Sequence, residues 1–315
     1  MIQKAHLLTG RPVALLLDDL CIPRASYYRW KEDQGRAEPV KRDRSGGTGI
    51  VPPTPEEVEK VKSFALSHAA IGYKRLSWTM IDRDVAYLRP YQVYTILDQA
   101  ELLARRVSPN PAALRRPADP ERPDQVWHVD LMYLYIEPRW FYLVDILDGY
   151  SRYLVHWRLN PTMHADSVML TVQEALDKLE LEQRTSDRQA YPGEPAIVHD
   201  NGSQFTGGQW RNFLAGAGRR DIRTRVAHPQ SNGRLERLHR THREEGLVVE
   251  PSNYEHGLSL MEQWERFYNH ERPHSALDYL RPVDYYRGDP QARLDAREDK
   301  LSMALAKRQA YWQSV

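Results

Sequence analysis

Apolar positions between residues 126 and 226 form short runs, and some of them recur at helical spacing. Short apolar runs predict β-strands, whereas apolar residues three and four positions apart predict amphipathic helices. The runs predict strands at 126–136, 140–147, 153–159, 195–199 and 221–226. The helical spacing predicts helices at 166–181, 207–215 and from about 231. This mixture predicts an α/β layered fold in which the first two strands form an antiparallel pair.

The segments on both sides of this region carry only helical patterns. Residues 54–57 match a capping box with proline at the first helical position, so a helix is predicted to begin there. Two further helices are predicted at 74–81 and 90–99, which completes a small all-α module. Downstream, the spacing predicts a helix at 254–268 and a helical tail within 282–315 that docks on the core or on a second subunit.

Composition narrows the class of protein. The 315 residues, 41% of them hydrophobic, allow two or three domains with real cores. The mean hydropathy is −0.68, and no apolar run approaches the roughly 20 residues that span a bilayer. The N-terminus lacks the long apolar segment of a signal peptide. The single cysteine, Cys21, excludes an internal disulfide and a Cys-rich zinc module, so we expect a soluble cytoplasmic protein.

Three acidic residues stand in unusual contexts. Asp130 lies inside an apolar run, Asp200 ends another run and precedes Asn-Gly, and Glu236 lies in a predicted helix. A carboxylate in an apolar strand is costly unless it is paired or binds a metal, and carboxylate oxygens suit Mg²⁺ or Mn²⁺. Taken singly, each acid also has an ordinary explanation. Asp130 would be a buried hydrogen-bonded aspartate, Asp200 a turn former and Glu236 a helix cap.

The spacing of these acids and the residues around them resemble a known family. Thirty-five residues separate Asp200 from Glu236, which resembles the D,D(35)E signature of the retroviral-integrase superfamily of DNA transposases. Five stretches in the same order resemble bacterial insertion-sequence transposases, at 127–130, 142–152, 199–205, 228–237 and 268–277. The resemblance covers about residues 10–290. The chain departs from retroviral integrases in lacking the residues of their N-terminal His/Cys zinc domain.

The resemblance implies a fold and a chemistry. The fold would be RNase H-like, a mixed five-stranded sheet with flanking helices, with Asp130 on the central strand, Asp200 after the fourth strand and Glu236 on a following helix. The activity would be that of a DDE polynucleotidyl transferase, which cleaves DNA at element ends and transfers the 3′-OH to target DNA. Asp130, Asp200 and Glu236 would be the catalytic and metal-binding residues. Asp130 would bridge two Mg²⁺ or Mn²⁺ ions roughly 3.5–4 Å apart, with one further acid on each.

The domain organisation follows from the linkers and the resemblance. Charged, Gly and Pro residues mark one linker at 38–53, and five prolines mark another at 107–123. The predicted units are a helix-turn-helix-like segment at 1–37, a small helical DNA-binding domain at 54–106, a catalytic core at 124–285 and a helical tail at 286–315. The segment at 12–30 equally fits a helical hairpin whose aromatic residues simply pack.

Basic residues indicate where DNA would bind. Eight arginines lie between 219 and 243, a clustering that a phosphate backbone would attract, although a solvated helix face is the alternative. The predicted DNA-binding residues are Arg24, Tyr27, Arg29, Lys74, Arg75, Arg105, Arg106, Arg234, Arg237 and Arg240. Arg240 alternatively pairs with Glu236, one helical turn away.

The partners implied by the resemblance are double-stranded DNA of the element's terminal repeats and the target, further copies of the chain on DNA, and an upstream helix-turn-helix protein. A membrane is not among them, and the location implied is the bacterial cytoplasm, at the nucleoid when DNA is bound.

Other acids and histidines near the three candidates are interpreted as structural. Asp145 and Asp148 lie near the end of the second predicted strand and are read as turn and structural acids. His128 and His199 lie close to the candidate acids in sequence, and both are interpreted as packed or as supporting the site rather than as metal ligands.

Three other functional classes are weighed against this one. A DNA-binding regulator built on an inactive integrase core would not need the three acids. A glycosidase would use two carboxylates without a metal, but nothing around Glu236 favours a sugar cleft. A tyrosine recombinase rests only on the 18 tyrosines.

Overall fold

The computed structural model of the chain describes residues 13, 51–103, 120–186, 189–224, 233–246 and 249–315. The chain divides into two units, Met1–Pro52 and Pro53–Val315, and the second unit is described below. Apart from Val13, the predicted helix-turn-helix-like segment lies outside the described residues. Five of the predicted DNA-binding residues also lie outside the described residues, namely Arg24, Tyr27, Arg29, Arg105 and Arg106.

Three helices form the small module that precedes the core. They are α4 (Pro55–Ser67), α5 (Tyr73–Asp82) and α6 (Pro90–Gln99). The predicted capping box at the start of α4 is confirmed, because Thr54 Oγ1 accepts from Glu57 N–H at 3.3 Å and Glu57 accepts from Thr54 N–H at 2.9 Å. Val61, Met80 and Val93 are fully buried where the helices meet, so the module has an apolar core of its own.

A mixed five-stranded sheet forms the centre of the core, as the sequence predicts. Its strands are β1 (Val126–Ile136), β2 (Arg139–Asp148), β3 (Leu154–Asn160), β4 (Ala196–His199) and β5 (Asp221–Arg223). Their spatial order is β3-β2-β1-β4-β5, so β1 is the central strand. The β1–β2 and β2–β3 pairs are antiparallel, whereas β1–β4 and β4–β5 are parallel.

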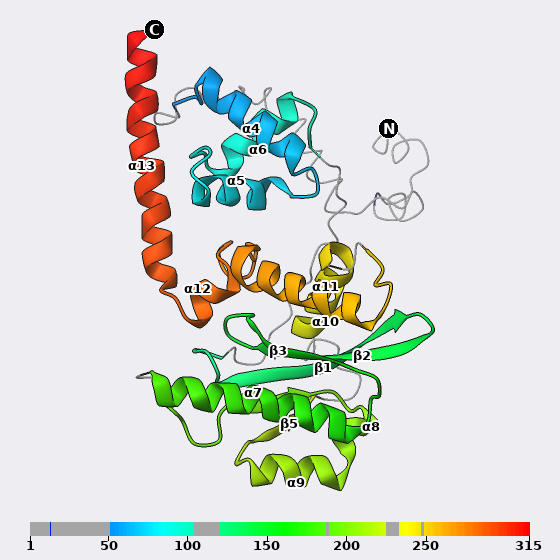
Figure 1. The fold of residues 1–315 in the computed structure, drawn as a ribbon. Helices are drawn as coiled ribbons and strands as arrows, with labels where there is room; N and C mark the ends of the chain where they lie inside the picture. Colours follow the sequence, from blue (N-terminus) through cyan, green and yellow to red (C-terminus); the bar gives the residue numbers. More distant parts are fainter. Residues whose placement is uncertain (1–12, 14–50, 104–119, 187–188, 225–232, 247–248) are drawn as a thin grey trace. The chain divides into compact units, whose positions relative to one another are not determined.

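Helices cover both faces of this sheet (Figure 1). One face carries α7 (Ala165–Thr185), α8 (Ser203–Thr206) and α9 (Gly208–Gly216). The other carries α10 (Gly233–Thr241), the π-helical turn η3 (His242–Gly246), α11 (Tyr254–Arg266) and the π-helical turn η4 (Phe267–Glu271). An apolar cluster fills the space on each side of the sheet. This layered arrangement is the RNase H-like fold expected from the sequence.

Strand alternation decides which face each residue of β1 meets. Trp127 and Val129 belong to the apolar cluster beneath α7, whereas Met132 and Leu134 belong to the cluster beneath α10 and α11. Because successive side chains on a strand point to opposite faces, Asp130 faces the same side as Met132. Asp130 therefore lies on the face that α10 covers.

The C-terminal region forms α12 (Pro282–Tyr286) and the long α13 (Pro290–Ser314). Arg297 on α13 donates to both carboxylate oxygens of Asp82 at the end of α5, at 2.9 and 2.7 Å. The helical tail was expected to dock on the core or on a second subunit, but these bonds dock it on the small helical module. No helix in the described part of the chain is long and apolar enough to cross a membrane.

Candidate active site

Asp130 is held on the central strand beneath α10. Its side chain is 15% exposed, and its Oδ1 accepts the N–H of Leu131 at 2.9 Å. In the antiparallel register of β1 and β2, Asp130 lies directly opposite Asp145. Directly opposed residues point to the same face, so the two carboxylates are neighbours.

Asp200 directly follows β4, the parallel neighbour of β1. The pairs Val126–Ala196 and His128–Val198 define a constant offset between the two strands. β4 ends at His199, so Asp200 is the first residue after the strand that lies beside β1. Asp200 Oδ1 accepts the N–H of Gly202 at 2.8 Å, which fixes the carboxylate in the turn where the strand ends.

Glu236 lies in the first turn of α10 and is exposed. The helix is held on the sheet by its apolar face, since Leu235 is fully buried and Leu238 is 2% exposed. Residues 225–232, which precede this helix, lie outside the described residues. Because α10 packs on the face to which Asp130 points, Glu236 and Asp130 lie on the same side of the sheet.

In this structure the side chains of Asp130, Asp200 and Glu236 are not arranged as the ligands of one metal ion. Among the described residues, no group of three His, Cys, Asp or Glu side chains is arranged to hold a metal ion. Nevertheless, the donor chemistry fits a hard divalent cation, because all three groups are carboxylates, and Asp130 lies on β1 while Asp200 directly follows the adjacent strand β4. The roles of the three acids as catalytic and metal-binding residues remain a prediction.

His239 connects the helix of Glu236 to the acids of the sheet. Its Nε2 lies 3.1 Å from Asp145 Oδ2, and its Nδ1 lies 3.9 Å from Asp130 Oδ2. Burial disfavours the charged imidazolium, but the hydrogen bond and charge of Asp145 and the charge of Asp130 together raise the pKa of His239. His239 therefore carries positive charge more readily than an ordinary histidine.

His128 and Arg234 form a second link between β1 and α10. Arg234 Nη1 lies 2.9 Å from His128 Nε2, and a guanidinium can only donate, so His128 accepts through Nε2. Burial, with added repulsion from Arg234 and Arg152, lowers the pKa of His128 to about 3. A neutral His128 is thus a structural partner of Arg234, which agrees with the interpretation that it is packed.

His199 supports the turn that carries Asp200. The fully buried imidazole donates through Nδ1 to the carbonyl of Asp200 at 2.6 Å, and its Nε2 lies 2.6 Å from Asp221 Oδ1. Its ring stacks on Phe205 with the ring centroids 4.5 Å apart. This histidine acts on the backbone beside the candidate acid, as its place next to Asp200 predicts.

Asp145 and Asp148 have different environments, although their place near the end of the same predicted strand indicated the same structural role for both. Asp148 ends β2 and accepts from Asp124 N–H, Ser151 N–H and Ser151 Oγ, which makes it the structural turn acid that was predicted. Its burial raises its pKa to about 6. Asp145 is instead in mid-strand, opposite Asp130 and bound to His239. The sequence reasoning missed His239, whose only signal was its position three residues after Glu236 on one helix.

The predicted DNA-binding residues in the described part of the chain differ in their surroundings. Lys74 and Arg237 are exposed, whereas Arg234 contacts His128. Arg240 donates to Glu244 at 2.8 Å, so the alternative pairing with Glu236 is not the one adopted. Arg75 donates to Glu245 at 3.2 Å, and the same carboxylate receives two bonds from the buried Arg272. Their role in DNA binding remains a prediction.

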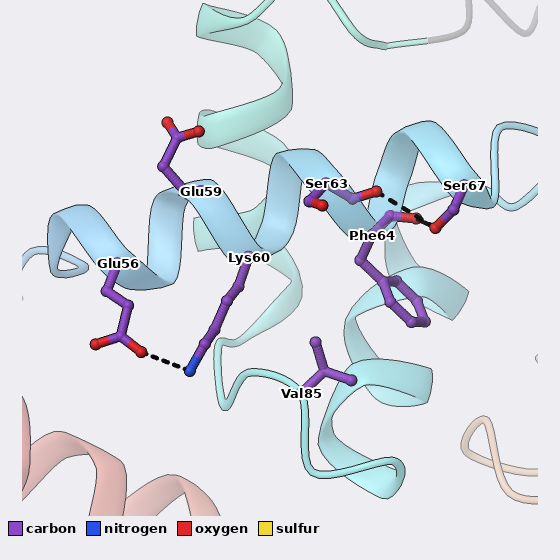
Figure 2. A pocket seen from close by; sticks show the side chains of 7 residues that line it. All are labelled: Glu56, Glu59, Lys60, Ser63, Phe64, Ser67 and Val85. Carbon is purple, nitrogen blue, oxygen red and sulfur yellow. Dashed lines mark hydrogen bonds and ion pairs between the residues drawn. The ribbon is translucent and has the colours of Figure 1, made fainter.

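A surface pocket on the small helical module is separate from the candidate active site (Figure 2). Its lining consists of Glu56, Glu59, Lys60, Ser63, Phe64, Ser67 and Val85. Lys60 and Glu56 pair within it at 2.8 Å, as two exposed residues one helical turn apart. None of the three candidate acids lines this pocket.

Comparison with known proteins gives the class of this chain. Two family models, both described as the integrase core domain, match residues 120–229 and 218–282. A transposase of insertion sequence element IS904 from Lactococcus lactis is 27% identical over 168 residues, which span 52% of this chain and 61% of that protein. A protein of Mycobacterium tuberculosis, named as a candidate transposase of IS986/IS6110, is 22% identical over 84% of this chain and 94% of its own length. Among solved structures, the catalytic domain of Mos1 mariner transposase aligns with a TM-score of 0.38 at 14% identity, covering 58% of this chain and 83% of that one.

The two family matches together extend from residue 120 to residue 282, which is more than half of the chain. The matched region contains the whole sheet and all three candidate acids. The chain thus belongs to the integrase core family. The two relatives described above are named as transposases of bacterial insertion-sequence elements.

Proposed function

We propose that this chain catalyses DNA strand cleavage at the ends of a mobile element and transfer of the resulting 3′-OH to target DNA. One observation carries the proposal. Asp130 lies on the central strand β1, Asp200 directly follows the parallel neighbour β4, and α10, which packs on the face of Asp130, bears Glu236. Family membership and the names of the relatives supply the substrate class.

Two divalent cations, Mg²⁺ or Mn²⁺, would activate the attacking oxygen and stabilise the leaving oxygen. Asp130 and Asp200 would hold them from positions fixed by backbone N–H groups, and Glu236 would complete the set from α10. With water as the nucleophile, a phosphodiester bond breaks and a free 3′-OH leaves. With that 3′-OH as the nucleophile, a new phosphodiester forms and the 3′ oxygen of the target strand leaves. Neither step needs a covalent protein intermediate.

Positive side chains near the acids would bind the DNA backbone. Arg237 and Arg240 are exposed on the helix of Glu236. The Arg240–Glu244 pair is an exposed surface pair one helical turn apart, and such pairs contribute little to stability. A DNA phosphate can therefore replace Glu244 as the partner of Arg240 with little loss of free energy. The active form would be a homo-oligomer on paired element ends, either by itself or with an upstream helix-turn-helix protein.

The test uses the full chain and a linear duplex that carries the inverted repeats flanking its gene. Asp130→Asn, Asp200→Asn and Glu236→Gln should each bind this duplex like the wild type but lose Mn²⁺-dependent nicking and joining by at least about 10³-fold. Glu262→Gln, which changes an exposed carboxylate on α11, is the matched control and should keep both activities.

Two results would overturn the proposal. Undiminished joining by any of the three acid variants would remove that acid from the site. A wild-type preparation that binds the duplex and never cuts it in Mg²⁺ or Mn²⁺ would instead indicate a regulator built on an inactive core.

A further inference from the structure

Asp145 is a buried acid to which the proposed chemistry assigns no role. Its side chain is 2% exposed, and within the described part of the chain its Oδ1 has no hydrogen-bond partner. A carboxylate buried this deeply is unfavourable unless it is paired. An apolar residue would pack in mid-strand without that penalty, so the acid needs a reason to be there.

The position of Asp145 beside Asp130 adds electrostatic repulsion to the free-energy cost of burying its carboxylate. The two residues are directly opposite each other on β1 and β2, with their side chains on the same face. Like charges in opposed positions repel and destabilise a sheet. A positive or hydrogen-bonding group between them is needed to offset that repulsion.

His239 occupies this place. Its Nε2 is 3.1 Å from Asp145 Oδ2, and its Nδ1 is 3.9 Å from Asp130 Oδ2. The imidazole is 7% exposed, so protein groups rather than water determine its orientation. Because a carboxylate accepts at Nε2, the ring is turned so that Nδ1 faces Asp130.

We propose that Asp145 and His239 are a positioning pair for Asp130, resting on the proposed role of Asp130 as a metal ligand. Asp145 orients the imidazole through the 3.1 Å hydrogen bond, and the ring then packs beside Asp130, with Nδ1 3.9 Å from Oδ2, so that it limits where this carboxylate can turn on the face beneath α10. His239 follows Glu236 by three residues on the same helix, so this contact also sets the position of α10, and with it Glu236, relative to Asp130. Outer groups that orient metal ligands commonly change metal affinity by about 10–100-fold when removed.

The test measures Mn²⁺ binding to the full chain without DNA, by the loss of the free-ion signal in electron paramagnetic resonance. Asp145→Asn and His239→Gln should each weaken Mn²⁺ binding about tenfold or more. The double variant should be no weaker than the worse single variant, because the two residues act as a unit. Cleavage by both variants should recover with excess Mn²⁺, while the KM for the duplex stays unchanged.

His156→Gln is the matched control. His156 on β3 also pairs with a carboxylate, Glu174 of α7, at 3.0 Å, but it lies opposite Ile146, whose side chain packs in the cluster on the α7 face of the sheet. This variant should bind Mn²⁺ like the wild type. Urea denaturation of every variant checks the fold, and if His239→Gln does not fold, Asp145→Asn alone decides the outcome.

The outcomes separate the two proposals. If Asp130→Asn abolishes Mn²⁺ binding but Asp145→Asn binds Mn²⁺ like the wild type, the pair is only structural and the positioning role is overturned. If Asp130→Asn itself leaves Mn²⁺ binding and cleavage intact, the proposed function fails instead. Loss of stability without loss of Mn²⁺ affinity in the folded fraction also contradicts the positioning role.

Discussion

The side chain of Asn269 bonds both backbone groups of Leu154, accepting its N–H at 2.8 Å and donating to its carbonyl at 3.0 Å. Leu154 begins β3, the edge strand of the sheet, and Asn269 is fully buried in η4. One amide thus takes the place of a neighbouring strand at this position. The contact joins the helical layer to the sheet across 115 residues of sequence.

Asn269→Asp should therefore lower the free energy of unfolding by about 2–4 kcal/mol. The aspartate would place a second oxygen against the Leu154 carbonyl and bury an unpaired charge. Asn253→Asp is the matched control, because Asn253 caps α11 only as an acceptor, and aspartate caps equally well. Urea denaturation of both variants measures the difference. Equal effects at the two positions would contradict the proposed donor role of Asn269.

The docking of α13 depends on Arg297, which is 3% exposed and donates to Asp82 and to the carbonyls of Asp278 and Tyr279. Arg297→Lys should lower the free energy of unfolding by about 2–4 kcal/mol, since a lysine ammonium cannot reproduce the paired N–H donors of the planar guanidinium. Arg293→Lys, at a half-exposed position of the same helix, should change it by less than about 0.5 kcal/mol.

A double-mutant cycle identifies the partner of Arg297. If Asp82 supplies much of the contact, Asp82→Asn combined with Arg297→Lys should be less destabilising than the sum of the single changes. Additive effects would show that Asp82 contributes little and that the two backbone carbonyls account for the contribution of Arg297.

His242 should make the fold sensitive to acid. It is 1% exposed and stacks on Trp264 with ring centroids 5.1 Å apart, and burial lowers its pKa to about 4. The unfolded chain protonates this residue near pH 6.5, so its contribution to stability is present above that pH and is lost as the pH falls towards 4. Between pH 7 and pH 5 the loss amounts to about 2 kcal/mol.

His242→Phe removes the titration while preserving the stacked ring. The fall in unfolding free energy between pH 7 and pH 5 should therefore be about 2 kcal/mol smaller in this variant than in the wild type. Asp148 has the opposite effect, because its pKa is raised to about 6 and it favours the folded state at low pH. That contribution is common to both proteins and cancels in the comparison. Identical pH dependence of the two proteins would rule out His242 as the source.

Arg237 should contribute one phosphate contact if the proposed DNA surface is right. Arg237→Ala should weaken binding to all duplexes alike and reduce the slope of log affinity against log salt by about 1. Arg211→Ala, at an exposed position of α9 on the other face of the sheet, is the control and should leave the slope unchanged. Fluorescence anisotropy at several salt concentrations provides the measurement. An unchanged slope for Arg237→Ala would place DNA elsewhere.

Much of the fold follows from local pattern. The hairpin of β1 and β2, the long α7 and the capped start of α4 were predictable because apolar periodicity and capping residues act over a few positions. The central position of β1 was expected from the family resemblance and is confirmed by the strand order. The strand predicted at 221–226 begins at the expected residue, but β5 covers only Asp221–Arg223.

By itself, the sequence determined the order of the elements and the identity of Asp130, Asp200 and Glu236 as candidates, because spacing along the chain is a one-dimensional property. Only the tertiary structure decided that Asp145 faces Asp130, that His239 lies between them, and that α13 returns to α5. These relationships depend on strand register and helix docking, which join residues up to 215 positions apart. Local sequence does not encode such distances, since they arise when the apolar faces of separate elements are buried together.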